Sequence, residues 1–196
     1  MDSFPAFFPL AGRRVVIVGE GEHADGKARL FMGSPAEVDR IDDGRALDPE
    51  TYRGAVLAFI ASGDAAFDEL AAQAAREAGV PVNVVDRPPL CDFFTPALVD
   101  RGQVVAAVGT GGASPVLAQV LKQELEGAIP EGSGRVAALL QDFRKAVQAA
   151  FPDLGERRNF VLGVLQGPAA AAAMEGRMDE ARRLMAEAVA GVSPPG

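Results

Sequence analysis

Short apolar runs rich in β-branched residues recur along the first half of this 196-residue chain. The runs RVVIV from Arg14, AVLAFIA at 55–61 and VPVNVVD at 80–86 have the length and composition of strands. The stretch DAAFDELAAQAAREAG repeats its apolar positions at helical spacing and stops at Gly79, as a helix does. QVVAAVGTGG at 103–112 is expected to be another strand. Alternating strands and helices predict an α/β fold with a Rossmann-like parallel sheet covered on both faces.

The second half of the chain has helical composition throughout. Ser114 and Pro115 are typical of a helix start, with serine as N-cap and proline at the first position, and Pro130 ends this helix. Further helices are expected at about 135–150, 155–165 and 178–190, followed by a frayed tail or linker at 191–196. This change in composition predicts two domains, a cofactor-binding domain at 1–112 and a helical region at 113–196.

The charge balance and the rare residues exclude several classes of protein. The chain has 19 Lys+Arg and 27 Asp+Glu, a net charge of −8, and none of the basic stripes that nucleic-acid binders carry. Cys91 and His23 are the only residues of their types, which excludes an intrachain disulfide and a Cys/His zinc cluster, and no metal site is expected. The acidic, proline-broken N-terminus is unlike a signal peptide, and no apolar run approaches the roughly 20 residues that span a bilayer. We expect a cytoplasmic globular protein.

A glycine motif lies directly between the first strand and the first helix. The residues Gly19-Glu20-Gly21-Glu22-His23-Ala24 fit the pattern G-x-G-x-x-[GA]. In such a turn Gly19 allows the tight bend, Gly21 lets the backbone approach a pyrophosphate, and the small Ala24 lets the helix pack on the sheet. Glu22 and His23 fall on the first helical turn, where His23 would lie at the edge of a cofactor or in solvent. The alternative is an ordinary glycine turn.

A dinucleotide site also needs an acidic residue about 20 positions later, at the end of the second strand, to bind the ribose hydroxyls. Asp39, Asp42 and Asp43 are all within range. The segment between the two clear strands is short, which leaves room for only an abbreviated second strand.

Asp86 ends an apolar strand and should lie at the carboxyl edge of the sheet, where open α/β sheets bind ligands. A carboxylate there can act as a general acid or base. It can equally cap the turn that precedes Pro88. Asn83, on the same strand, either orients a ligand or faces solvent.

A second glycine turn contains Thr110, Gly111 and Gly112 and leads into the helix that begins near Ser114. Such a turn exposes backbone N–H groups and the positive end of a helix dipole, which suits carboxylates or phosphates. Thr110 and Ser114 can add hydroxyl donors. Alternatively, Ser114 only caps the helix and the glycines only make the bend.

Four stretches together resemble one family. They are MDSFPAFFPLAGRRVVIVGEGEHADGKARL at the N-terminus, VNVVDRPPLCDFFTPALVDRG, VVAAVGTGGASPVLAQVLKQELE and GERRNF at 155–160. In order and spacing they resemble the siroheme synthase dehydrogenase/ferrochelatase module, that is, precorrin-2 dehydrogenase. The resemblance covers most of residues 1–160. The chain departs from the family pattern at three places. Glu20 interrupts the first run of glycines, and Ser62 and Gly63 stand where the family has Thr-Asp. The segment between Gly33 and Val56 is shorter than in typical members.

The resemblance implies a fold and an activity. The fold would be a Rossmann domain followed by a dimerisation region and a small helical domain, in a homodimer. The activity would be NAD-dependent oxidation of precorrin-2 to sirohydrochlorin, with insertion of Fe²⁺ as a second reaction. Asp86 would be the catalytic aspartate, Ser62 and Gly63 would join the first glycine turn at NAD, and the second glycine turn with Asn83 would bind the substrate. The alternative is a tetrapyrrole-binding or chelatase-only module that has lost the redox step.

Overall fold

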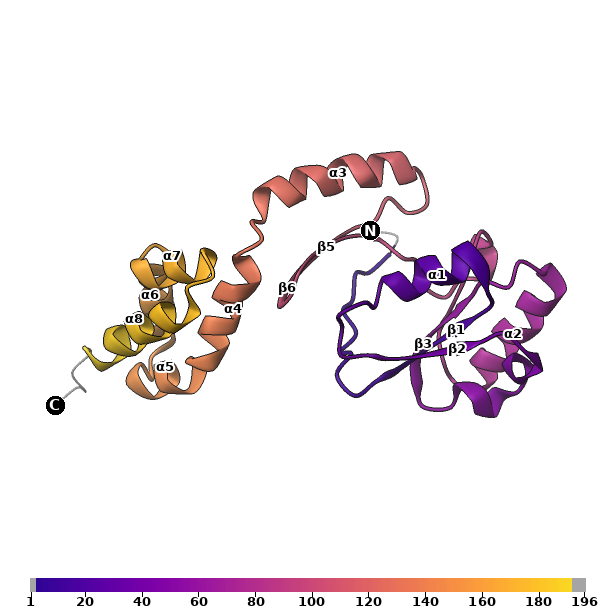
Figure 1. Ribbon diagram of the computed structural model, residues 1–196, viewed down its shortest axis with the longest axis horizontal. Coiled ribbons are helices and arrows are strands. Elements are labelled where there is room, and N and C mark those ends of the chain that lie inside the picture. The colour runs from indigo at the N-terminus through magenta and orange to yellow at the C-terminus, as the bar shows by residue number, and fades with distance from the viewer. Residues whose placement is uncertain (1–2, 192–196) are drawn as a thin grey trace. The chain divides into compact units, whose positions relative to one another are not determined.

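The computed structural model describes residues 3–191, and the chain divides into two compact units that meet between Thr95 and Pro96 (Figure 1). The first unit contains a four-stranded sheet and the second a two-stranded sheet with helices. The sequence predicted a domain boundary between residues 112 and 113, which lies after the boundary of the two compact units. The predicted division into a cofactor-binding domain and a helical region stays a prediction.

The sheet of the first unit is entirely parallel. Its strands follow the order β2-β1-β3-β4, and Val16 in β1 lies opposite Asp39 in β2 and Ala58 in β3. The strands are β1 (Arg14–Val18), β2 (Glu37–Ile41), β3 (Ala55–Ile60) and β4 (Val82–Val84). The predicted parallel, Rossmann-like α/β sheet is confirmed.

Alternation along β1 builds two cores, one on each face of the sheet. Val15 and Ile17 pack in a cluster that includes Ala24 of α1 (Gly21–Arg29), whereas Val16 and Val18 pack in a cluster with alanines of α2 (Ala65–Glu77). These four side chains of β1 are fully buried. Because each buried aliphatic side chain contributes about 1.5–3 kcal/mol, burial on both faces stabilises β1 as an interior strand of the sheet.

The second strand is not abbreviated. β2 has five residues, as many as β1, and pairs with it along its whole length, so the expectation of a shortened strand is wrong. The compact part is the connection from β2 to β3, which consists of two 3-10 turns, η1 (Gly44–Leu47) and η2 (Pro49–Tyr52). Tyr52 is fully buried there, and its hydroxyl donates to the Ala46 carbonyl at 2.7 Å. These two turns replace the helix that usually links such strands.

The second unit begins with an antiparallel hairpin of β5 (Ala97–Arg101) and β6 (Val104–Val108). The expectation that residues 103–112 add a strand to the parallel sheet is therefore wrong. Only Gly102 and Gln103 separate the two strands, and Gly102 has a φ of 75°. So short a link permits a hairpin, whereas parallel neighbours need a crossover of about a dozen residues.

Helices form the rest of the second unit. They are α3 (Pro115–Ala128), α4 (Ser133–Asp142), α5 (Arg144–Ala150), α6 (Leu154–Leu165), α7 (Pro168–Met174) and α8 (Met178–Ala190). The predicted helix at 135–150 is two helices separated at Phe143, whereas the predictions near 155–165 and at 178–190 are confirmed. Leu139 of α4 and Met185 of α8 are fully buried in one core with the alanines of α7. Beyond Gly191, the predicted tail lies outside the described residues.

None of the helices formed by residues 3–191 has both the length and the apolar composition required to cross a bilayer.

Gly134 joins the hairpin to the helices of the second unit. A Cβ at this position of α4 would overlap with the Arg101 carbonyl at the end of β5. Contact between backbones at this distance leaves no room for a side chain. The helix α3 also lies along the hairpin in this unit (Figure 1).

We predict that Gly134→Ala lowers the free energy of unfolding by about 2–4 kcal/mol, because the methyl group forces α4 away from the hairpin. Gly163→Ala in α6 is the matched control, since no atom lies within 4 Å of its added Cβ. That variant should be neutral or more stable by up to about 1 kcal/mol. Urea unfolding followed by circular dichroism measures both, and equal stabilities would contradict the close contact at Gly134.

Candidate active site

Gly19 packs closely against backbone at the carboxyl edge of the parallel sheet. It follows β1 with a φ of 112°, and a Cβ there would overlap with the carbonyl of Ala61, just after β3. Gly21 has a φ of 75° and open space around its Cα. Glycine is therefore required at position 19 by contact and by conformation, and favoured at position 21 by conformation alone.

The N-terminus of α1 presents backbone N–H groups next to this turn. Its N-cap, Glu20, makes no side-chain hydrogen bond to them. Glu22 and His23 are exposed on the first turn, and Ala24 is fully buried against the sheet. The N–H groups and the helix dipole can bind an anion here. The carboxylates of Glu20 and Glu22 oppose such binding.

The loop after β3 is held by a buried carboxylate. Asp68 of α2 is only 4% exposed and accepts hydrogen bonds from the Ser62 hydroxyl at 2.6 Å and the Ser62 backbone N–H at 3.1 Å. Gly63 follows with a φ of 82°. The sequence analysis missed Asp68, although it precedes Ala71 and Ala72 at the spacing of the buried helical face. Through Ser62, Asp68 positions the backbone against which Gly19 packs.

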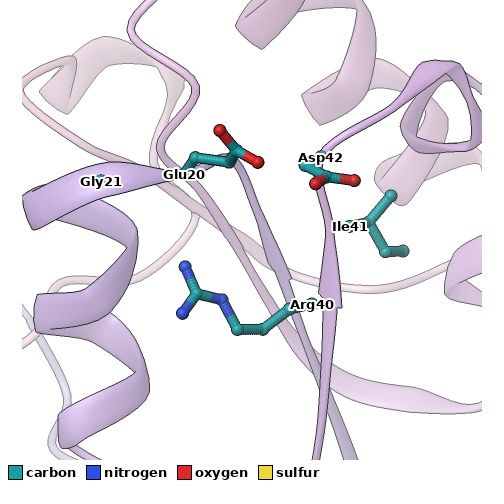
Figure 2. A pocket seen from close by; sticks show the side chains of 6 residues that line it. Glu20, Gly21, Arg40, Ile41 and Asp42 are labelled. Atoms are coloured by element: carbon teal, nitrogen blue, oxygen red, sulfur yellow. The ribbon is translucent and has the colours of Figure 1, made fainter.

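A pocket of about 360 Å³ opens between the glycine turn and the end of β2 (Figure 2). It is lined by Gly19, Glu20, Gly21, Arg40, Ile41 and Asp42. In Figure 2 the carboxylates of Glu20 and Asp42 lie on one side of the opening, and the Arg40 guanidinium reaches toward α1 on the other. This is where a Rossmann fold binds the adenosine half of a dinucleotide.

The structure separates the three acidic candidates after the glycine motif. Asp39 lies within β2 and pairs with Arg14 at 3.3 Å. Asp43 caps η1 and pairs with Arg45 at 3.0 Å, and hydrogen bonds from Arg45 lower the pKa of Asp43. Asp42 follows β2 directly, lines the pocket, and accepts no hydrogen bond from any residue that the structure describes. Of the three, only Asp42 thus lines the pocket without a partner among the described residues.

Asp86 follows β4 at the same carboxyl edge as the glycine turn. Its side chain is exposed, and its φ of 57° makes it the one non-glycine among residues 3–191 with a positive φ. Because β3 lies between β1 and β4, two strand spacings, roughly 10 Å, separate Asp86 from the glycine turn. Asp86 does not line the pocket at β2. Its neighbour Arg87 pairs with Glu69 of α2 at 2.5 Å.

Lys27 of α1 is a second residue that the sequence analysis missed. Its ammonium donates to the Thr95 hydroxyl at 3.2 Å and lies 5.4 Å from the centre of the Phe59 ring. Burial lowers the pKa of Lys27, and the nearby Cys91 and Asp86 partly offset this shift. A half-buried cation close enough to Asp86 to feel its charge suits a ligand that carries carboxylates.

Asn83 does not face solvent. It is 6% exposed, and its amide nitrogen donates to the Phe93 carbonyl at 2.9 Å and contacts the Cys91 sulfur at 3.5 Å. These contacts hold the segment after η3 (Pro88–Leu90) against β4. Direct binding of substrate by Asn83 stays a prediction. The hydrogen bonds that Asn83 makes in the structure position the chain that follows Asp86.

The second glycine turn lies in the second unit. Ser114 is the N-cap of α3, accepting from the Leu117 N–H at 3.2 Å, which confirms the predicted helix start. Thr110 accepts from the Ser114 N–H at 3.3 Å, while Gly111 and Gly112 have φ values of 61° and 82°. The hydroxyls of Thr110 and Ser114 thus support the turn. Within residues 3–191, no group of three or more His, Cys, Asp or Glu side chains is placed to hold a metal ion.

Comparison with known proteins gives two family matches. Residues 6–97 match a family described as putative NAD(P)-binding, and residues 132–189 match the sirohaem synthase dimerisation region. A siroheme synthase of Stutzerimonas stutzeri (strain A1501) is 41% identical over 99% of this chain, and one of Azotobacter vinelandii (strain DJ / ATCC BAA-1303) is 40% identical over 99%. The chain is thus similar over nearly its whole length to part of these siroheme synthases.

The extent of these matches matters for function. The chain spans about half the length of the siroheme synthases it matches, 46% of each of the two relatives above. A solved structure of SirC, precorrin-2 dehydrogenase, matches with a TM-score of 0.74 and 17% identity, covering 95% of this chain and 98% of that one. This likeness, with the match to the dimerisation region, confirms the predicted fold class, a Rossmann-like parallel sheet domain followed by a dimerisation region and a small helical domain.

We predict that Asp68→Ala lowers the free energy of unfolding by about 1–3 kcal/mol, because it leaves the Ser62 N–H unpaired beneath the glycine turn. Ser62→Ala is the control, since it removes the hydroxyl but keeps the hydrogen bond from the Ser62 N–H to Asp68. That variant should lose about 0.5–1.5 kcal/mol. Thermal unfolding monitored by circular dichroism compares the two, and an Asp68→Ala protein as stable as the wild type would contradict this role.

Proposed function

We propose that this chain oxidises precorrin-2 to sirohydrochlorin, with NAD as cofactor, in siroheme biosynthesis. Similarity to siroheme synthases over nearly the whole chain, and the match of residues 132–189 to the sirohaem synthase dimerisation region, support the pathway. The observation that carries the reaction is Asp86, an exposed carboxylate in a left-handed backbone conformation at the carboxyl edge of the parallel sheet. Such conformations cost free energy in non-glycine residues and cluster at active sites.

The residues at the sheet edge fit a dinucleotide. Gly19, Gly21 and the N-terminus of α1 would hold the pyrophosphate, with Ser62 and Gly63 forming the adjoining loop. Strand order reverses between β1 and β3, where an extended dinucleotide crosses from the β2 side to the β4 side. The nicotinamide would then lie toward Asp86. When bound, NAD supplies the acceptor for the hydride that the oxidation releases.

Asp86 would take the proton that accompanies this hydride. A carboxylate at this position can act as a general base once the substrate lies against it. Lys27 adds a positive charge beside Asp86 for the carboxylates of the tetrapyrrole. In the second unit, the turn with Thr110, Gly111 and Gly112 and the start of α3 at Ser114 would offer backbone donors to further carboxylates.

We also propose insertion of Fe²⁺ into sirohydrochlorin as a second activity. The tetrapyrrole nitrogens are the ligands of the iron, so the protein has only to hold the ring and accept the protons that the nitrogens lose. Asp86, exposed at the sheet edge, can accept them. A tetrapyrrole-binding or chelatase-only module is the alternative, and the assay below separates it. We place both reactions in the cytoplasm.

We predict that Asp86→Asn reduces NADH formation from precorrin-2 and NAD at least about 100-fold, because it removes the base. Asparagine tolerates a left-handed backbone, so the melting temperature should change little. Asp86→Gly is the companion variant, which relieves the backbone conformation and should be equally inactive but no less stable. Anaerobic absorbance measurements follow the reaction. Tetrapyrrole binding without any NADH formation by the wild type would favour the alternative.

We predict a homodimer, supported by the dimerisation region at 132–189 and by an apolar stripe on α3. Val116, Leu117, Val120 and Leu121 are 74%, 49%, 47% and 37% exposed. Covering such a stripe removes apolar surface from water. Light scattering at micromolar concentration should give twice the chain mass, and Val116→Glu with Val120→Glu should shift it toward the monomer. A monomeric wild type would contradict the prediction.

A further inference from the structure

We propose that a small pocket among the helices of the second unit binds an organic anion that combines one carboxylate with an apolar body. The pocket lies between α4, α5 and α6 and has a volume of about 250 Å³ (Figure 1). It is called the α4–α6 pocket below, and it is lined by Leu140, Arg144, Val147, Gln148, Arg157 and Val161. All of these residues belong to the second unit, whereas Asp86 and the first glycine turn belong to the first.

Aliphatic side chains form one part of the lining. Val147 of α5 is only 4% exposed, and Leu140 of α4 and Val161 of α6 are half-buried against the same helical core. A hydrocarbon chain that covers the half-buried pair removes apolar surface from water, which favours binding. Because the volume lies below the roughly 300–1,000 Å³ of sites for drug-sized ligands, only a small body fits.

Planar hydrogen-bond donors form the other part of the lining. Arg144 and Gln148 lie four residues apart on one side of α5, and Arg157 of α6 completes the set. No acidic residue lines the pocket. Guanidinium groups bind carboxylates through charge-assisted hydrogen bonds, and the neighbouring aliphatic side chains disfavour a strongly hydrated anion such as phosphate. This combination selects a carboxylate on an apolar body.

Arg157 is held in place by contacts within the protein. Its Nε and Nη2 donate to the Phe151 carbonyl at 3.1 and 3.0 Å, and Nη2 also donates to the Pro152 carbonyl at 3.1 Å. The Phe151 ring packs against Phe160 of α6, with the ring centroids 4.6 Å apart. Carbonyl groups fix the guanidinium without neutralising its charge, so a ligand that binds it has little side-chain freedom to freeze.

The positive charge at the α4–α6 pocket has no carboxylate partner within residues 3–191. Nine arginines of this range form ion pairs with carboxylates, whereas Arg144 and Arg157 do not. Among the acids close in sequence, Asp142 pairs with an arginine of α8, Asp153 caps α6, and Glu156 does not line the pocket. In a chain with a net charge of −8, two such uncompensated arginines at one pocket favour an anion there.

The test is titration of the isotope-labelled full chain with hexanoate, followed by NMR at about 0.15 M salt. Hexanoate joins a carboxylate to a short apolar chain. We expect saturable binding with a dissociation constant of about 5 mM or tighter, and a shift of the Gln148 side-chain amide signal. Acetate lacks the apolar body and hexanol lacks the charge, so each should bind at least about fivefold more weakly.

Arg144→Gln is the decisive variant. Arg144 is exposed and its side chain donates no hydrogen bond to any residue that the structure describes, so the fold should not suffer. The variant should weaken hexanoate at least about fivefold. Arg157→Gln should weaken it as much, and its melting temperature is measured as well because it also loses the bonds to the Phe151 carbonyl.

Lys145→Gln and Arg158→Gln are the matched controls. Each removes one positive charge from an exposed residue next to a lining arginine, outside the pocket. They should change the affinity less than about twofold, because salt screens exposed charges. Equal weakening by the controls and by Arg144→Gln would indicate unspecific attraction and overturn the site.

Three further results would also overturn the proposal. Binding that none of the variants weakens would place hexanoate elsewhere, such as on the apolar stripe of α3. The other two are the absence of saturable binding and an affinity for inorganic phosphate equal to that for hexanoate. Each of these results would leave the proposed oxidation of precorrin-2 intact, since the residues tested take no part in it.

Discussion

The contact between Gly19 and the backbone that leaves β3 is the constraint on which the first unit depends. A side chain at position 19 would overlap with the Ala61 carbonyl, so the glycine brings the ends of β1 and β3 together at one edge. The same contact places the N-terminus of α1 and the end of β2 around one pocket. Asp68 supports it from beneath by holding Ser62. The buried carboxylate of Asp68 and the glycine at position 19 thus pack against the same loop after β3.

The charges of this protein require local recognition of anionic ligands. With a net charge of −8, the overall field opposes a dinucleotide and a ring with many carboxylates. Under the proposed function, binding would therefore depend on backbone N–H groups at helix starts and on single cations such as Lys27.

The second unit depends on a different close contact. Gly134 lets α4 lie against the backbone of the hairpin, and the alanines of α7 let α8 pack in the core beside it. Small residues at both contacts allow helices to approach closely. In contrast, α3 has an apolar stripe that stays exposed among residues 3–191, and the following residues 132–189 match a dimerisation region.

Local patterns by themselves determined much of this protein. Alternating apolar runs gave the parallel sheet, Ser114 and Pro115 marked the start of α3, and the glycine motif located the pocket, because these signals depend on near neighbours in sequence. The pairing of strands and side chains in the folded protein decided the rest. Only the fold showed that β6 pairs with β5 in a hairpin and does not join the parallel sheet. Only the fold distinguished Asp42 from Asp39 and Asp43, because these two pair with Arg14 and Arg45. The left-handed backbone at Asp86, after β4, and the groups that surround Lys27 of α1 likewise belong to the folded protein. The spacing of residues in the sequence does not predict them.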